Sequence, residues 1–149
     1  MKSYETSKLV KGEDMNHHDT LYGGRISEWF AEASFLAASH LYGKYGYGKY
    51  GETDHLVVVE VHSLKFLAPV YNGDILRFIA TGIQAGKTSL TVYTKALKNN
   101  TEVKAAEGYV SFITIDEARK KIPHHIIIGE PETAEEKEAL EKFRRLTNR

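Results

Sequence analysis

The segment Asn16-His17-His18-Asp19-Thr20-Leu21-Tyr22-Gly23-Gly24 decides how this chain is organised, because a polar loop here leads into a helical pattern. The residues that follow, 25–39, carry apolar side chains around more than one helical stripe, which predicts a helix buried over most of its circumference. A helix buried to that extent needs a sheet around it. Arg25, Glu28 and Glu32 interrupt the apolar pattern, and all three fall on one side of the helix.

Strand patterns fill most of the remaining chain. Residues 3–10 predict a short first strand, and the Gly/Tyr/Lys tract at 42–51 is expected to end the helix. The density of Val, Leu and Phe over residues 55–67 predicts a long and largely buried strand. Further strands are expected over 75–83, 88–98 and 103–115, with turns between them. One buried helix followed by an antiparallel meander is an α+β architecture, with the sheet curled around the helix.

The two ends of the chain extend this core without adding a second one. We expect a single domain over residues 1–149, with an N-terminal segment at 1–15 and a C-terminal extension with a helix at 124–149. Thr133 and Glu136 form a capping-box pattern, so the last helix is expected to begin near Thr133.

Composition excludes several classes of function. Twenty Lys and Arg balance twenty Asp and Glu, so the chain has no field suited to nucleic acid or to an anionic membrane. It contains no cysteine, which excludes disulfides, thiolate nucleophiles and cysteine metal sites. No apolar run reaches the length of a membrane span, and we expect a cytoplasmic protein. The adjacent pair His17-His18 has poor spacing for a metal, and none is expected.

The motifs, taken together, resemble those of the hot-dog-fold acyl-CoA thioesterases of the cytosolic long-chain acyl-CoA hydrolase type. That family carries an Asn-x-x-Gly-x-x-x-Gly-Gly segment entering a helix, here from Asn16 to Gly24, and later segments match at 66–70, 73–74 and 86–89. The resemblance implies a hot-dog fold and hydrolysis of an acyl-CoA to free acid and CoA, with no cofactor besides the CoA of the substrate. It also implies dimers with sites between subunits, up to hexamers built as trimers of dimers.

Two departures from the family pattern affect the catalytic prediction. Asp19 stands where the family has glycine, and Ala31 stands where it has its catalytic carboxylate. We therefore expect the next residue, Glu32, to act as general base or nucleophile, partly desolvated by its apolar neighbours. The alternative for Glu32 is a solvated ion-paired position.

The resemblance also implies roles for the loop and the glycines. The Gly24 N–H would polarise the thioester carbonyl at the positive end of the helix, while Asn16 would orient substrate or water. The glycine pair could instead serve only close packing.

Substrate contacts are implied for His18, Gly23, Phe66, Lys87, Thr88 and Ser89. A plain hairpin turn remains the alternative for the last three. Two other functions stay open: hydration or dehydration of an acyl thioester, which would use His18, and non-catalytic acyl-CoA binding, which Ala31 favours.

Overall fold

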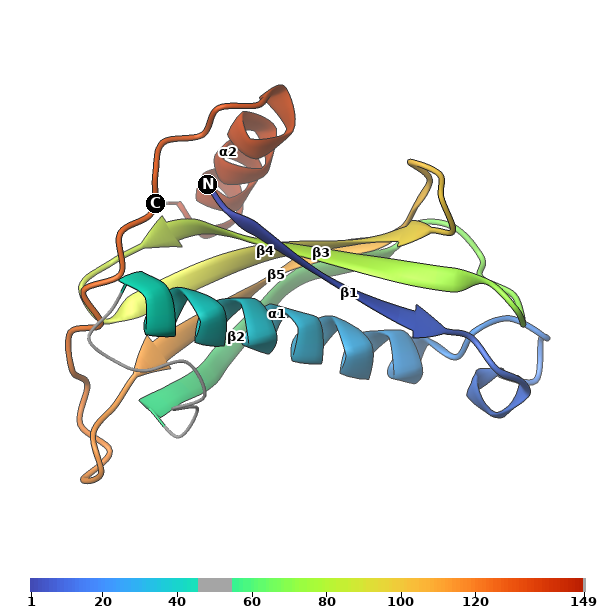
Figure 1. The fold of residues 1–149 in the computed structure, drawn as a ribbon, viewed down its shortest axis with the longest axis horizontal. Helices are drawn as coiled ribbons and strands as arrows, with labels where there is room; N and C mark the ends of the chain where they lie inside the picture. The colour runs from blue at the N-terminus through green and yellow to red at the C-terminus, as the bar shows by residue number, and fades with distance from the viewer. Residues whose placement is uncertain (46–54, 149) are drawn as a thin grey trace.

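The computed structural model describes residues 1–45 and 55–148, in which five strands form one open antiparallel sheet. The strands are β1 (Ser3–Leu9), β2 (Leu56–Phe66), β3 (Ile75–Ala85), β4 (Ser89–Lys98) and β5 (Lys104–Thr114), in the spatial order β1-β3-β4-β5-β2. Helix α1 (Gly23–Tyr45) lies along one face of the sheet, and α2 (Ala134–Thr147) covers part of the other (Figure 1). A short 3₁₀ turn, η1 (Gly12–Asp14), precedes α1. The predicted α+β architecture is confirmed.

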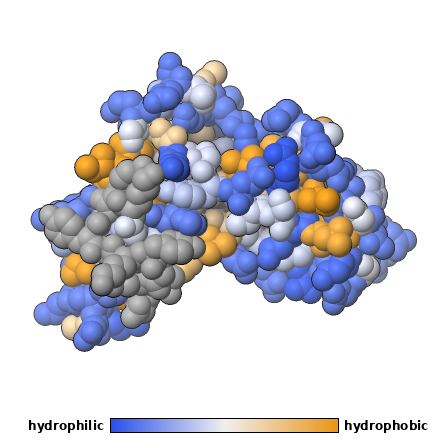
Figure 2. Space-filling view, viewed as in Figure 1, coloured by the Kyte–Doolittle hydropathy of each residue, from blue (hydrophilic) through white to orange (hydrophobic). Residues whose placement is uncertain are grey.

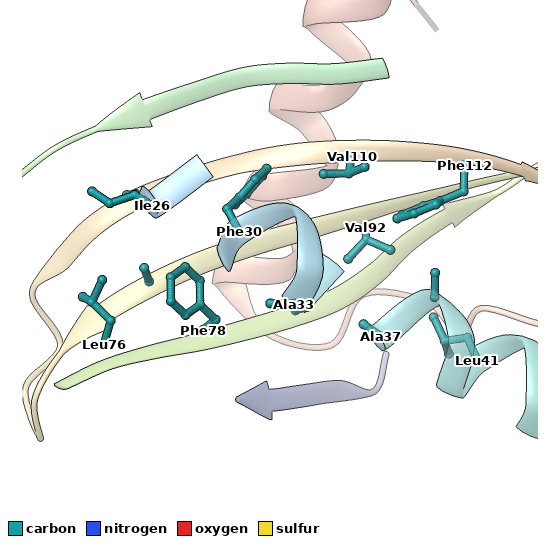
Figure 3. Packing of buried hydrophobic residues seen from close by; sticks show 14 of the residues in the cluster. Ile26, Phe30, Ala33, Ala37, Leu41, Leu76, Phe78, Val92, Val110 and Phe112 are labelled. Carbon is teal, nitrogen blue, oxygen red and sulfur yellow. The ribbon is translucent and has the colours of Figure 1, made fainter. Parts of the chain in front are cut away.

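The main core lies between α1 and the concave side of the sheet. Figure 3 shows apolar side chains of α1 at helical spacing facing side chains of β3, β4 and β5. The labelled members are Ile26, Phe30, Ala33, Ala37, Leu41, Leu76, Phe78, Val92, Val110 and Phe112. The approach is close at Gly108, where an added Cβ would lie 2.9 Å from the Cα of Leu64 and 3.1 Å from the Phe30 ring. Only glycine therefore fits β5 at this position without displacing β2.

A second, smaller core joins α2 to the opposite face of the sheet. Alternate strand residues point to opposite faces, so Tyr93 and Tyr109 face α2 while their neighbours Val92 and Val110 face α1. Phe143 of α2 is fully buried, with its ring centroid 5.4 Å from that of Tyr109. The predicted capping box is present, because Thr133 Oγ1 accepts a 3.1 Å hydrogen bond from the Glu136 N–H.

Two expectations about these elements need correction. Helix α1 does end within the Gly/Tyr/Lys tract, at Tyr45, but it passes through the first glycine of the tract, Gly43; residues 46–51 of the tract lie outside the described residues. Nor is β2 largely buried: Val58, Val59 and Val61 are 42%, 52% and 47% exposed. The reason is that β2 is an edge strand, which in the described part of the chain pairs with β5 alone.

The surface seen in the view of Figure 1 is mostly hydrophilic, with separate hydrophobic patches (Figure 2). Of the helices in the described part of the chain, none combines the length and the apolar character that crossing a membrane requires.

Candidate active site

A groove of about 370 Å³ opens where α1 begins, and we call it the helix-start groove. Its walls are the loop residues Thr20 and Leu21, the first turn of α1 at Gly23 and Ile26, and residues 66–70 after β2. The Phe66 ring packs on the helix start, since a Cβ added to Gly23 would lie 3.6 Å from it. The predicted substrate residues Gly23 and Phe66 are therefore brought together in one groove.

Two backbone N–H groups at the helix start are available to a ligand. The Tyr22 carbonyl accepts hydrogen bonds from Arg25 N at 2.9 Å and Ile26 N at 3.2 Å. Within residues 1–45 and 55–148, the N–H groups of Gly23 and Gly24 have no acceptor. They lie at the positive end of a long helix, where a partial negative charge is stabilised. The helix start can therefore hold an oxyanion.

Tyr22 is a neighbour of this site that the sequence did not single out. Its side chain is 59% exposed, and a Cβ added to Gly24 would lie only 2.4 Å from its ring. Gly24 therefore gives the Tyr22 ring room beside the helix start, which is a packing role in addition to the predicted catalytic one.

Asn16 holds the loop that leads into the helix. Its Oδ1 accepts hydrogen bonds from His18 N at 2.8 Å and from Thr20 N at 3.3 Å, and its Nδ2 donates to Thr20 Oγ1 at 3.1 Å. Asn16 does not line the groove itself, whereas Thr20 does. In this chain Asn16 acts on the groove through Thr20.

An ion pair between a buried carboxylate and a partly exposed arginine fixes the same loop from the other side. The Asp14 side chain is 6% exposed, and its Oδ1 lies 3.2 Å from Arg25 Nε. Its Oδ2 accepts from Lys11 N at 2.9 Å, and its carbonyl accepts from Tyr22 N at 3.0 Å. Asp14 therefore ties both ends of the loop to the first turn of α1, a role that no sequence motif indicated.

Glu32 lies away from the groove. Since each helical residue advances about 100°, Glu32 is about 180° around the helix from Gly23. Its carboxylate is 58% exposed and lies 3.3 Å from Lys8 Nζ on β1. The expected desolvation of Glu32 is thus wrong within the single chain, although its catalytic role stays a prediction.

Ala31 faces the opposite edge of the sheet from Glu32. It shares a helix face with Tyr42, to within about 20°, and the Tyr42 hydroxyl lies 3.2 Å from Nδ1 of His55, directly before β2. Glu28 is exposed and pairs with Arg25 at 3.1 Å, as its spacing indicated.

The remaining predicted residues do not join the groove in the single chain. The exposed rings of His17 and His18 pack together at 3.9 Å between centroids, and no three His, Asp or Glu side chains of the described residues gather to hold a metal. The turn carrying Lys87, Thr88 and Ser89 lies beyond the other end of α1 (Figure 1). It packs on the C-terminal extension, where His124 Nε2 donates to the Ser89 carbonyl at 2.7 Å.

Comparison with known proteins agrees with this fold. Residues 18–105 match the sequence profile of the thioesterase superfamily, and the chain belongs to this family. A Bacillus subtilis protein, YkhA, named as an uncharacterized acyl-CoA thioester hydrolase, is 27% identical over 139 residues, covering 87% of this chain and 74% of its own length.

Solved structures extend the comparison to three dimensions. A crystal structure described as an apo-hexameric acyl-CoA thioesterase shares 25% identity with a TM-score of 0.79, covering 98% of this chain and 88% of that one. The acyl-CoA hydrolase from Staphylococcus aureus, solved with butyryl coenzyme A and coenzyme A, gives a TM-score of 0.80 at 24% identity, with coverages of 98% and 82%. The hot-dog fold and the thioesterase resemblance are confirmed.

Proposed function

We propose that this chain is an acyl-CoA thioesterase, hydrolysing an acyl-CoA to the free acid and CoA. The observation that carries the proposal is a helix start where, among the described residues, the N–H groups of Gly23 and Gly24 have no acceptor and where Gly23 lines a groove with an apolar wall, in a member of the thioesterase superfamily. Relatives of similar fold are named acyl-CoA hydrolases, and one was solved with an acyl-CoA. A cytoplasmic location is part of the proposal.

The chemistry assigned to the groove follows from its charges and contacts. The Gly24 N–H stabilises the negative charge that develops on the thioester oxygen, helped by the positive helix end. Asn16 keeps Thr20 in place at the groove wall. Phe66 supports the acyl chain next to the carbonyl, and His18 and Gly23 complete the substrate contacts.

Activation of water needs a carboxylate, and we assign this role to Glu32. The assignment requires Glu32 to release Lys8, or a second chain to bring substrate toward it, because Glu32 lies on the side of α1 that faces β1. The same observation favours a second candidate function, non-catalytic binding of acyl-CoA, because Ala31 offers no carboxylate on the side of the helix nearer β2.

A second copy of the chain completes the proposed site. Among the residues that the structure describes, no strand pairs with the outer edge of β2, which carries three exposed valines, and such an edge readily pairs with another strand. Antiparallel pairing of two β2 strands about a twofold axis places the α1 helices of the two copies in opposite directions. The start of one α1 then lies at the same end of the dimer as the turn with Lys87, Thr88 and Ser89 of the other copy. That turn is assigned to the CoA arm, and dimers of this kind assemble further into hexamers.

Release of CoA, measured with a thiol reagent over acyl-CoAs of increasing length, tests the proposal. The protein contributes no thiol because it has no cysteine. The informative pair of variants is Glu32→Gln, which removes the carboxylate, and Lys8→Gln, which breaks the same ion pair but keeps the carboxylate.

If Glu32 activates water, Glu32→Gln lowers kcat at least 100-fold, in line with the contribution of a general base, while Lys8→Gln retains turnover. Equal small effects of both variants would show that Glu32 only forms an ion pair. Saturable acyl-CoA binding without release of CoA from any chain length would replace hydrolysis by the binding function.

A further inference from the structure

A pocket of about 290 Å³ lies on the sheet face opposite α1, between the C-terminal half of α2 and the β2 edge, and we call it the outer pocket. Lys65 of β2 stands on one wall, and Arg145 and Leu146 of α2 stand on the other. Tyr109 of β5 lines the pocket between them. The outer pocket shares no lining residue with the helix-start groove, so the two are separate cavities.

The charges of the outer pocket favour an anion. Neither Lys65 nor Arg145 makes an ion pair within the described part of the chain. A third cation of the lining, Lys142, is 3.1 Å from Glu138 Oε1. Two cationic side chains on facing elements are therefore left to bind a negative group, and the arginine fork suits a carboxylate.

Glu107, the one acidic residue that lines the outer pocket, does not prevent an anion from binding. The Glu107 carboxylate accepts a 2.7 Å hydrogen bond from the Tyr93 hydroxyl and lies 3.1 Å from Lys104 Nζ. These contacts outweigh burial and hold the Glu107 pKa below its usual value. The Glu107 carboxylate is therefore already engaged by the Tyr93 hydroxyl and by Lys104, which also lies 3.6 Å from Glu135 Oε2.

The apolar residues of the outer pocket indicate what kind of group is attached to the anionic head of the ligand. Leu146 is 54% exposed, one helical turn beyond the buried Phe143, and offers a contact for a hydrocarbon chain. The Tyr109 ring is only 5% exposed and is packed between the rings of Tyr93 and Phe143, so it presents no free face on which a nucleotide base could stack. The volume of about 290 Å³ is at the lower end for small-molecule sites, which favours a small ligand with a short to medium hydrocarbon chain.

We infer that the outer pocket binds a medium-chain carboxylate, with its head group between Arg145 and Lys65 and its chain along Leu146. This ligand has the chemistry of the acid that acyl-CoA hydrolysis releases, so its interpretation as a product rests on the proposed function. The binding itself does not, because the pocket and its charges lie on the other face of the sheet from the helix-start groove.

Methyl NMR of the full chain during titration with octanoate tests the inference. The Leu146 methyls report on the outer pocket, and the Ile26 methyl groups report on the helix-start groove. Octanol, which has the same chain without the charge, is the matched ligand control. Arg145→Gln removes the head-group contact, and Arg144→Gln is the matched protein control, because Arg144 is the exposed neighbour on the same helix and does not line the pocket.

The expected result is a saturable shift of the Leu146 methyls with octanoate and no such shift with octanol. Arg145→Gln weakens this binding at least tenfold, whereas Arg144→Gln changes it less than twofold. Octanoate shifts confined to Ile26 would overturn the inference, as would equal effects of the two variants. Loss of the proposed hydrolytic activity would leave the Leu146 titration unchanged, so the two proposals fail separately.

Discussion

Replacing Asp14 by Asn tests whether the ion pair between the buried Asp14 carboxylate and Arg25 holds the start of α1. The substitution keeps an acceptor for Lys11 N but removes the charge that faces Arg25 Nε at 3.2 Å. Breaking a fully buried pair costs about 3–5 kcal/mol, and a hydrogen bond to a charged group contributes about 1.5–3 kcal/mol. Because Arg25 is 38% exposed and can turn to water or to Glu28, we expect the lower range, about 2 kcal/mol.

Thermal unfolding followed by circular dichroism measures this loss. For a chain of this length, about 2 kcal/mol lowers Tm by roughly 4–8 °C. Glu28→Gln is the control, because Glu28 binds the same guanidinium but is 66% exposed, and its loss costs less than about 1 kcal/mol. If Asp14→Asn and Glu28→Gln lower Tm equally, the Asp14 carboxylate does not anchor the loop, and the reasoning is refuted.

Three further predictions address the groove, the sheet edge and the C-terminal extension. Phe66→Ala is expected to raise KM roughly fivefold with little change in Tm, because it removes about 1 kcal/mol of apolar contact from the half-exposed wall of the groove. An unchanged KM in steady-state kinetics would contradict the assignment of Phe66 to substrate binding. Val61→Lys is expected to reduce the mass measured by light scattering to that of a smaller assembly, whereas Ile127→Lys, at a more exposed apolar position away from β2, is expected to leave the mass unchanged.

The third of these predictions concerns the pH dependence of stability and involves His124 in the C-terminal extension. Burial lowers the pKa of His124 below its usual value of 6.5, because it disfavours the charged ring, and this outweighs the opposing effect of the hydrogen bond that Nε2 donates to the Ser89 carbonyl. The stability that it contributes is fully present above pH 6.5 and is lost as the pH falls through the lower pKa of the folded state. Tm should therefore fall between pH 7.5 and pH 5.5, roughly the range in which an unperturbed histidine titrates, and His124→Gln should flatten that part of the profile; an equally steep fall in the variant would assign it to other groups.

The fold was largely predictable because its local signals agree with one another. The apolar pattern of α1, the strand runs and the capping box at Thr133 each indicated the element that forms. The errors arose where burial or helix length depends on the whole fold and not on the local sequence pattern. A run of valines predicts burial, but whether β2 lies inside or at the edge of a sheet depends on strand order, and the helix passes Gly43 because helical structure tolerates a glycine at modest cost.

The candidate site was less predictable because it depends on which way each side chain faces. Gly23, Gly24 and Phe66 were found from their motif, and the structure places Gly23 and Phe66 on one groove. Tyr22 and Asp14 were missed, since neither an exposed tyrosine nor an acid in a loop carries a sequence signal. Glu32 and Ala31 are adjacent in sequence, but about 100° of helix rotation directs one toward β1 and the other toward the side of β2.

Because Ala31 and Glu32 face different sides of α1, the choice of catalytic carboxylate depends on how two chains pair. If two chains pair through β2, Ala31 lies on the interface side of α1, whereas Glu32 remains at the far edge with Lys8. The unbonded N–H groups at Gly23 and Gly24, the exposed valines of β2 and the remote position of Lys87 are all consistent with a site completed between two copies. The helix start can hold an oxyanion whether or not Glu32 supplies a catalytic carboxylate, so binding and turnover of acyl-CoA have to be measured separately in this chain.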